Sequence, residues 1–287
     1  MEAAFAELPL ALFTTLAPAG AGAFVALACV FFATSFSSEQ LKKIDRMTLV
    51  PLVVVLVGFL CSFFHLASPL NAVGVFSGVG SSPLSNEILV GSVFVVVAIV
   101  YTVVALTGKL QGAARKGFAA LVAVLAVVFA GFTGAAYMMD TIASWSSPLL
   151  PFEIVGFSLV GGAALAALAL CLAGCAGEAL GRQGKNVLLI VGGVGALLGV
   201  FAAGAQIGGV ASLSNAVVSG ADLVAEALPL LIAGIVCVLA GAGTLFVVCL
   251  GKGSVPLAGL AVVLALVGIF CLRLAFYATQ LSVGLAC

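Results

Sequence analysis

The sequence is poor in charge, since Asp, Glu, Lys and Arg occupy only 7% of its 287 positions. A soluble domain carries about 25% charged residues, so this protein cannot form a water-exposed surface of any size. Hydrophobic residues make up 64% of it, which excludes disorder because disordered segments are poor in large apolar residues. The composition predicts an all-α, polytopic integral membrane protein with up to about eight or nine crossings of roughly 20 residues.

Histidine is nearly absent, with His65 as its single occurrence. A b-type haem held between two histidines needs a pair of them, which argues against a haem-bearing subunit. Ten basic residues balance ten acidic ones, so no excess positive charge favours nucleic acid. The cysteines lie mostly in apolar runs, and neither an iron–sulfur spacing nor a Walker A motif is present. We therefore expect no prosthetic group or metal here, and any redox cofactor belongs to a partner.

Apolar runs bounded by charge or by Gly, Pro and Ser clusters predict eight transmembrane helices. These spans are expected at Pro9–Thr34, Met47–Leu66, Glu87–Thr107, Phe118–Met139, Glu153–Ala176, Asn186–Ser212, Ala227–Leu250 and Val255–Leu281. Residues 1–287 are predicted to form a single eight-helix domain. Gly195-x-x-x-Gly199 and Gly204-x-x-x-Gly208 in the sixth span have the spacing of close helix contacts, which ordinary packing explains.

The few charged residues are sorted between the two sides of the predicted bundle. Nine of the ten basic residues, Arg115 among them, lie in the connections after the first, third, fifth and seventh spans. The positive-inside rule makes this side cytoplasmic, so both termini are expected on the outer side of the plasma membrane. Among the acidic residues expected on the outer side, Glu153 begins the fifth span, and Asp222 and Glu226 lie in the loop before the seventh.

Ionisable residues on the outer side form the candidate functional site. His65 ends the second span, Glu87 begins the third, and the longest outer connection, residues 67–86, joins them. Asp140 ends the fourth span, and Arg273 lies about 27 Å into the eighth, near its outer end. Ionisable groups at membrane depth are costly and mark functional sites. The alternative is a plain surface loop with a solvated histidine and glutamate at its ends.

Two short motifs flank this long connection: His65-Leu66-Ala67-Ser68-Pro69 and Ser85-Asn86-Glu87. They resemble the HLxSP motif that ends the second helix, and the SNE motif that opens the third, in the membrane anchor subunit of dimethyl sulfoxide reductase. Further likeness extends along nearly the whole sequence. It includes Glu7-x-Pro9-Leu10, Tyr137, Asp140-Thr141, Trp145, Arg273 and Phe276-Tyr277.

The resemblance implies an anchor for two partners, a molybdopterin catalytic subunit and an electron-transfer subunit with four iron–sulfur clusters. It also implies that the anchor binds and oxidises menaquinol in anaerobic respiration and carries no prosthetic group itself. By motif position, His65 and Glu87 are the quinol-site groups. The full set of candidate quinol-binding residues is His65, Glu87, Ser68, Arg273, Tyr277 and Asp140.

Quinol oxidation removes two electrons and two protons, so the ring hydroxyls need proton acceptors. The neutral imidazole of His65 accepts a proton near neutral pH, and Glu87 is a second acceptor. Arg273 either holds a carboxylate in place or contacts a quinol oxygen. Asp140 either relays protons outward or is a solvated loop residue. Because electrons need a short path, the iron–sulfur partner is expected to dock on the outer side.

Two other functions are open at this point. The protein is either the anchor of a sibling reductase with another terminal acceptor, such as polysulfide or tetrathionate, or a small-molecule transporter. A transporter usually places polar groups or broken helices near the membrane midplane, whereas the interiors of these spans are Ala, Val, Leu and Gly. The sequence does not distinguish a sibling anchor from a dimethyl sulfoxide reductase anchor, because the terminal substrate binds to another subunit.

Overall fold

The computed structural model describes residues 2–64, 69–251 and 253–283, and this part of the chain is helical without a strand. Eight of its spans are long and apolar enough to cross a membrane, which confirms the predicted fold class. The second span joins two consecutive helices. The elements are α1 Glu2–Ala6, α2 Leu8–Ala33, α3 Ser38–Met47, α4 Leu49–Phe63, η1 Pro69–Gly78, α5 Pro83–Leu106, α6 Gly112–Ala135, α7 Leu150–Leu172, η2 Glu178–Leu180, α8 Gly181–Val210, α9 Gly220–Leu250 and α10 Val255–Ala278.

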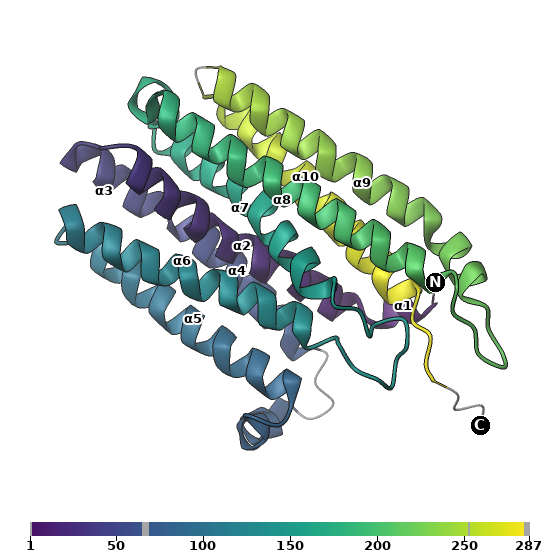
Figure 1. The fold of residues 1–287 in the computed structure, drawn as a ribbon. Helices are drawn as coiled ribbons and strands as arrows, with labels where there is room; N and C mark the ends of the chain where they lie inside the picture. Colours follow the sequence, from purple (N-terminus) through teal and green to yellow (C-terminus); the bar gives the residue numbers. More distant parts are fainter. Residues whose placement is uncertain (1, 65–68, 252, 284–287) are drawn as a thin grey trace.

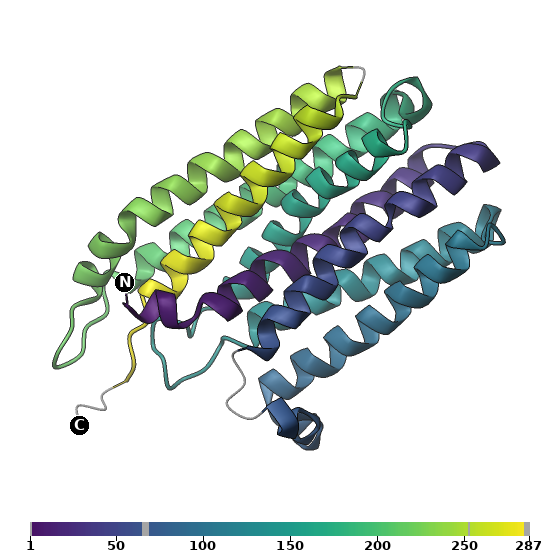
Figure 2. The ribbon, with the colours of Figure 1, turned by 180° about the vertical axis from the view of Figure 1, so that it is seen from behind.

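The helices form an up-and-down bundle of two groups that meet along its middle (Figures 1 and 2). One group contains α2, α4, α5 and α6, and the other contains α7 to α10. Helices α2 and α7 pack against each other between the groups, and most of their side chains are buried. The remaining spans are buried on one side only, so their apolar outer faces are available to lipid.

Glycine allows α2 and α7 to touch backbone to backbone. A Cβ added at Gly22 would lie 1.8 Å from the carbonyl oxygen of Ser158, and one at Gly162 would lie 2.1 Å from the carbonyl carbon of Gly22. Ser158 also donates its hydroxyl to the Pro18 carbonyl at 2.7 Å, across the same contact. Close packing and interhelical hydrogen bonds replace the hydrophobic driving force that helices lack within a bilayer.

The glycine spacings noted in the sixth span behave differently from each other. Gly195 and Gly199 approach α7 closely, and a Cβ added at Gly156 of α7 would lie 2.3 Å from the Gly199 nitrogen. Gly204 and Gly208 have open space where a Cβ would point. The first pair therefore serves helix packing, and the second pair does not contribute to packing among the described residues.

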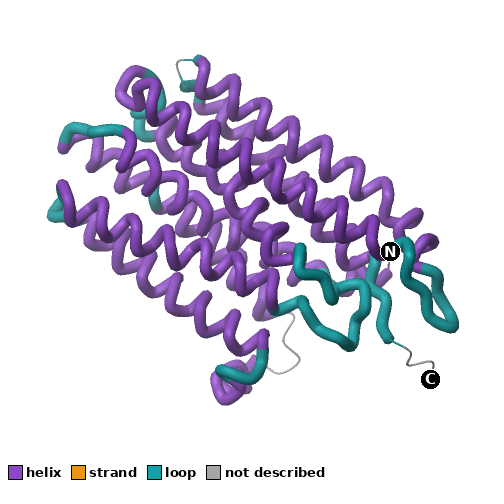
Figure 3. The backbone as a smooth tube through the Cα atoms, in the orientation of Figure 1, coloured by secondary structure: helices purple, strands orange, loops and turns teal. Residues whose placement is uncertain are grey.

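The two ends of the bundle carry different structures (Figure 3). Both termini, η1 and the long loops after α6 and α8 lie at one end, which we call the terminal end. The short connections, and the helix ends beside them that carry most of the basic residues, lie at the other end, which we call the basic end. This segregation matches the predicted sorting of charge, while the side of the membrane that each end faces stays a prediction.

Several predicted boundaries are wrong because the first turns of helices contain polar residues that look like loop residues in the sequence. Helix α5 begins at Pro83 after the N-cap Ser82, so Glu87 lies one turn inside the helix. Helix α9 begins at Gly220, which places Asp222 and Glu226 in its first two turns instead of in a loop. A helix start leaves free N–H groups that favour such residues.

Arg115 is also misplaced by the sequence, which assigns it to a loop. It lies in the first turn of α6, is 4% exposed, and donates through both terminal nitrogens to the Asp45 carboxylate on α3 at 2.6 and 2.8 Å. This bidentate pair joins the second and fourth spans at the basic end. Its guanidinium also stacks over the ring of Phe31 at 5.5 Å.

Candidate functional site

The first turn of α5 gives a different role to each residue of the Ser85-Asn86-Glu87 motif. The hydroxyl of Ser85 lies against Gly78 at the end of η1, where an added Cβ would approach it to 2.6 Å. Asn86 accepts a hydrogen bond from the Gly80 N–H at 2.7 Å, which holds the turn between η1 and α5. Glu87 is buried, with only 4% exposure. The first two residues of the motif therefore hold the loop before α5, and the third places a carboxyl group inside the bundle.

The carboxyl group of Glu87 is incompletely satisfied. Its Oε1 atom is buried and has no hydrogen-bond partner among the described residues, and the same holds for the hydroxyl of Thr133 on α6. Thr133 lies beside this carboxyl group, and Arg273 is near enough to interact with it electrostatically. A buried carboxyl oxygen without a partner is costly, so this atom is available to a ligand.

Four phenylalanines lie deeper in the bundle than Glu87, with Phe94 two turns after it on α5, and are called the aromatic floor: Phe13, Phe59, Phe94 and Phe129. Phe129 stacks on Phe94 at 5.6 Å and on Phe59 at 5.3 Å, and Phe13 packs edge-on against Phe59 at 5.4 Å. Gly91, one turn after Glu87, makes room for Phe59 and Phe129. The floor closes the bundle beneath Glu87 with rings from four helices.

Arg273 is the centre of a second buried group at the terminal end. Its guanidinium is fully buried and forms an ion pair with Glu153 of α7 at 2.8 Å. It also donates to Thr14 of α2 at 3.1 Å and to the hydroxyl of Tyr277 at 3.3 Å. Of the two roles expected for Arg273, the structure shows the first, because the arginine holds a carboxylate in place.

Aromatic rings surround this ion pair. The Arg273 guanidinium lies 4.2 Å from the ring centre of Phe276 and 5.1 Å from that of Tyr137. The hydroxyls of Tyr137 and Tyr277 share a hydrogen bond of 2.6 Å, and Trp145 stacks on Phe276 at 5.3 Å. Burial raises the pKa of Tyr137 well above its ordinary value, so its hydroxyl stays protonated and neutral.

Helix α2 connects the aromatic floor to the residues around Arg273 through two consecutive side chains. Phe13 belongs to the aromatic floor, and Thr14 binds Arg273. Glu87 on α5 and the Arg273–Glu153 pair therefore belong to one polar region that spans both helix groups near the terminal end. Apart from two tyrosines, its ionisable members are the carboxyl groups of Glu87 and Glu153 and the guanidinium of Arg273, which leaves Glu87 without an ionic partner of its own among the described residues.

The other predicted site residues have separate outcomes. Tyr277 is buried in the Arg273 group. Asp140 is exposed in the loop after α6, and its carboxylate makes no hydrogen bond or ion pair with the described residues, so the structure does not bring it to Glu87 or Arg273. His65 and Ser68 lie outside the described residues. His65 directly follows Phe64, the residue that caps the end of α4.

Sequence reasoning missed Thr133 and Thr14 as polar contacts of the site. Threonine is common in apolar helices and bonds its own helix, as Thr14 does to the Leu10 carbonyl at 2.8 Å. The sequence did offer one signal for these threonines, which is their depth in the membrane: both lie at the same end of their spans as Glu87. Gln206 of α8 was also missed; it is buried and donates to the Ser144 carbonyl at 2.7 Å, which fastens the loop after α6.

Comparison with known proteins gives concordant matches, two of which cover nearly the whole sequence. Residues 1–279 match the family described as DMSO reductase anchor subunit (DmsC). The sequence is 32% identical to the C subunit of anaerobic dimethyl sulfoxide reductase from Escherichia coli K12, over 100% of this protein and 99% of the relative. It is 28% identical to the E. coli anaerobic dimethyl sulfoxide reductase subunit YnfH, over 98% and 97% of the two proteins. The C subunit of the Haemophilus influenzae reductase is 28% identical over 58% of this protein and 59% of its own length.

Proposed function

This protein belongs to the family of DMSO reductase anchor subunits, and we propose that it binds and oxidises menaquinol at the terminal end of the bundle. The two electrons pass to an iron–sulfur partner subunit and then to a molybdopterin catalytic subunit during anaerobic respiration. In this function the protein is the quinol-oxidising part of a complex in the plasma membrane, and the terminal reduction takes place on another subunit.

The single observation that carries the proposal is the unpartnered carboxyl oxygen of Glu87 above the aromatic floor. A quinol presents two ring hydroxyls on an apolar ring, and this region presents a buried acceptor beside four phenylalanine rings. The hydroxyl donates to Glu87 Oε1, and Thr133 contributes a second polar contact. The ring itself gains apolar contact with the floor.

Proton transfer follows from the same arrangement. Oxidation of menaquinol to menaquinone releases two protons and two electrons. Glu87 accepts one proton as a carboxylate, and the imidazole of His65, which comes soon after α4 in the sequence, accepts the other. Glu153 is already paired with Arg273, so this pair supplies charge and rigidity near the site and leaves proton acceptance to Glu87. Both protons then leave through the nearby surface at the terminal end.

Two other assignments have less support. The spans contain few ionisable groups near their middle, and the buried ones gather near the two ends, which does not favour an ion-coupled transporter. A sibling reductase with another acceptor shares the same quinol chemistry and differs only in its catalytic partner. The names of the relatives, which are subunits of anaerobic dimethyl sulfoxide reductases, favour dimethyl sulfoxide.

The test uses Glu87→Gln, which keeps the size of the side chain and removes its ability to accept a proton. Membranes containing the assembled complex are assayed with a menaquinol analogue and, separately, with a reduced viologen dye that delivers electrons directly to the partner subunits. We expect quinol-driven turnover to fall at least about 100-fold, the lower range for loss of a general base. Dye-driven turnover should stay at the wild-type level.

Asp222→Asn is the matched control because Asp222 is an exposed carboxylate at the same end of the bundle. It should leave both activities unchanged. Wild-type quinol turnover in Glu87→Gln would refute the assignment of Glu87. Loss of both activities, together with loss of the complex from the membrane, would show that Glu87 is needed for assembly instead.

A further inference from the structure

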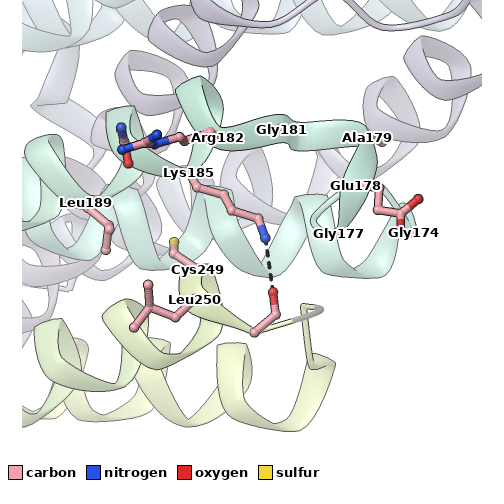
Figure 4. Close-up of a pocket in the computed structure, with 12 residues that line it drawn as sticks. Gly174, Gly177, Glu178, Ala179, Gly181, Arg182, Lys185, Leu189, Cys249 and Leu250 are labelled. Carbon is pink, nitrogen blue, oxygen red and sulfur yellow. Dashed lines mark hydrogen bonds between the residues drawn. The ribbon is translucent and has the colours of Figure 1, made fainter.

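A pocket of about 880 Å³ lies at the basic end, far from the quinol site, between the start of α8 and the end of α9 (Figure 4). It uses none of the residues assigned to quinol oxidation. Arg182, Lys185 and Leu189 of α8 all line it, at the three- and four-residue spacing that places side chains on one helix face. The pocket therefore has a polar and an apolar part along a single helix.

The polar part contains two cations that are only partly engaged. Lys185 donates from Nζ to the Gly251 carbonyl at 3.1 Å, which ties α8 to the end of α9 and leaves two of its three N–H groups free (Figure 4). Arg182 is exposed and makes no hydrogen bond or ion pair with another described residue. Asn186 adds an amide next to them. This set of donors suits a phosphate group.

The apolar part contains two leucines, one from each helix. Leu189 follows Lys185 by one turn, and Leu250, the last residue of α9, is 67% exposed. Both lie on spans whose apolar outer sides are available to lipid. A free phosphate ion gains nothing from contact with these apolar leucines. A phospholipid, by contrast, places its phosphate at the membrane interface and its acyl chains beside them.

One carboxylate also lines the pocket. Glu178 of η2 lies on the other side of Lys185 from Arg182, and its carboxylate points away from the lysine (Figure 4). The pocket therefore keeps a net positive charge of one from Arg182, Lys185 and Glu178. Neutralising Glu178 should increase that charge without changing the donors.

We propose that this pocket binds the headgroup of an anionic phospholipid from the leaflet at the basic end. Arg182 and Lys185 contact the phosphate, Asn186 donates to a headgroup oxygen, and an acyl chain lies along Leu189 and Leu250. Basic pockets between transmembrane helices on the cytoplasmic side are suited to such lipids. The bound lipid joins α8 to α9, beside the Lys185 bond that already links them.

The test measures lipid binding to the purified full-length protein in detergent by native mass spectrometry, with phosphatidylglycerol and phosphatidylcholine as probes. We expect phosphatidylglycerol to bind preferentially. Each basic residue near a membrane surface contributes about fivefold in affinity, so Arg182→Gln/Lys185→Gln should weaken phosphatidylglycerol binding by about 25-fold. Lys109→Gln/Lys116→Gln removes the same charge from the loop before α6 and the start of that helix, also at the basic end, and should leave binding unchanged.

A variant with the opposite expected effect on lipid affinity keeps the proposal testable if the double variant does not fold. Glu178→Gln should strengthen phosphatidylglycerol binding, by up to about fivefold. Equal binding of the two lipids by the wild type, or no effect of either pocket variant, would overturn the proposal. Displacement of phosphatidylglycerol by millimolar inorganic phosphate, with no effect of Leu250→Asn on lipid binding, would show an anion site and also overturn it.

Discussion

Arg273 is the residue that holds the terminal end of the bundle together. Its guanidinium is fully buried and binds Glu153 of α7 and Thr14 of α2, so one residue joins three helices. A charge buried at membrane depth is costly unless it is paired. Arg273 and Glu153 are therefore stable together, and either one alone destabilises the fold.

The first prediction concerns this pair. Arg273→Leu leaves the Glu153 carboxylate buried without a counter-charge and should lower the stability by about 3–5 kcal/mol. Thermal unfolding of the purified protein in detergent, followed by circular dichroism, measures the loss as a lower Tm. Arg273→Leu/Glu153→Leu should recover part of it because no unpaired charge remains.

Arg46→Leu on α3 is the control for this series, because this arginine is exposed, lies outside both proposed sites and should change stability by only about 0.5 kcal/mol. If Arg273→Leu and Arg46→Leu melted at the same temperature, the ion pair would contribute nothing to the fold. A double variant less stable than Arg273→Leu would show that leucine cannot fill the space left by Glu153.

Contact between α2 and α7 decides how the two helix groups meet. Gly22 and Gly162 let the backbones touch, and the hydroxyl of Ser158 bonds across the contact. Because Phe13 and Thr14 lie on the same α2, the position of this helix also sets the distance between the aromatic floor and Arg273. A shift of α2 therefore changes the site as well as the packing.

The second prediction tests this contact with Gly22→Ala, whose methyl group would meet the Ser158 carbonyl oxygen at 1.8 Å. The clash is with backbone, so the helices must separate, at a cost of about 1–3 kcal/mol. We expect a lower Tm of the purified protein. Gly193→Ala on α8 is the matched control because open space surrounds its Cβ position; an equal loss in both variants would remove the contact as the cause.

The two proposed sites lie at opposite ends of the molecule. Glu87 and the Arg273 group lie near the terminal end, and the basic pocket and most of the basic residues lie at the basic end. If the basic end is cytoplasmic, the proposed quinol site lies near the outer face. The iron–sulfur partner then docks on that face, where the electron path is shortest.

The third prediction tests this orientation. A full-length protein with alkaline phosphatase at its C-terminus should be active, because the enzyme folds outside the cytoplasm, and a green fluorescent protein fusion there should be dark. Fusions after residue 253, which omit α10, should show the reverse pattern. A fluorescent full-length fusion would place the C-terminus in the cytoplasm. Protease protection of the partner subunit in right-side-out vesicles would show that the partner docks on the cytoplasmic face instead.

Particular residues show which parts of the site can be predicted from the sequence. Glu87 and Arg273 are predictable because an ionisable group in or beside an apolar span is visible without any contact information. Thr133 and Thr14 are not, since a threonine gains its role only from the helix that packs beside it. Arg115 looks like a loop residue in the sequence because its partner Asp45 lies 70 positions earlier.

The sequence alone determined the membrane class, the eight spans, the sorting of basic residues and the position of Glu87 and Arg273 toward the same end of the bundle. These properties depend on local transfer free energies and charge, which each segment carries by itself. Only the tertiary structure decided that Arg273 binds Glu153, 120 positions away, and that one oxygen of Glu87 has no partner in the described part of the chain. Such contacts depend on which helices pack together and at what depth, and that is a property of the whole bundle.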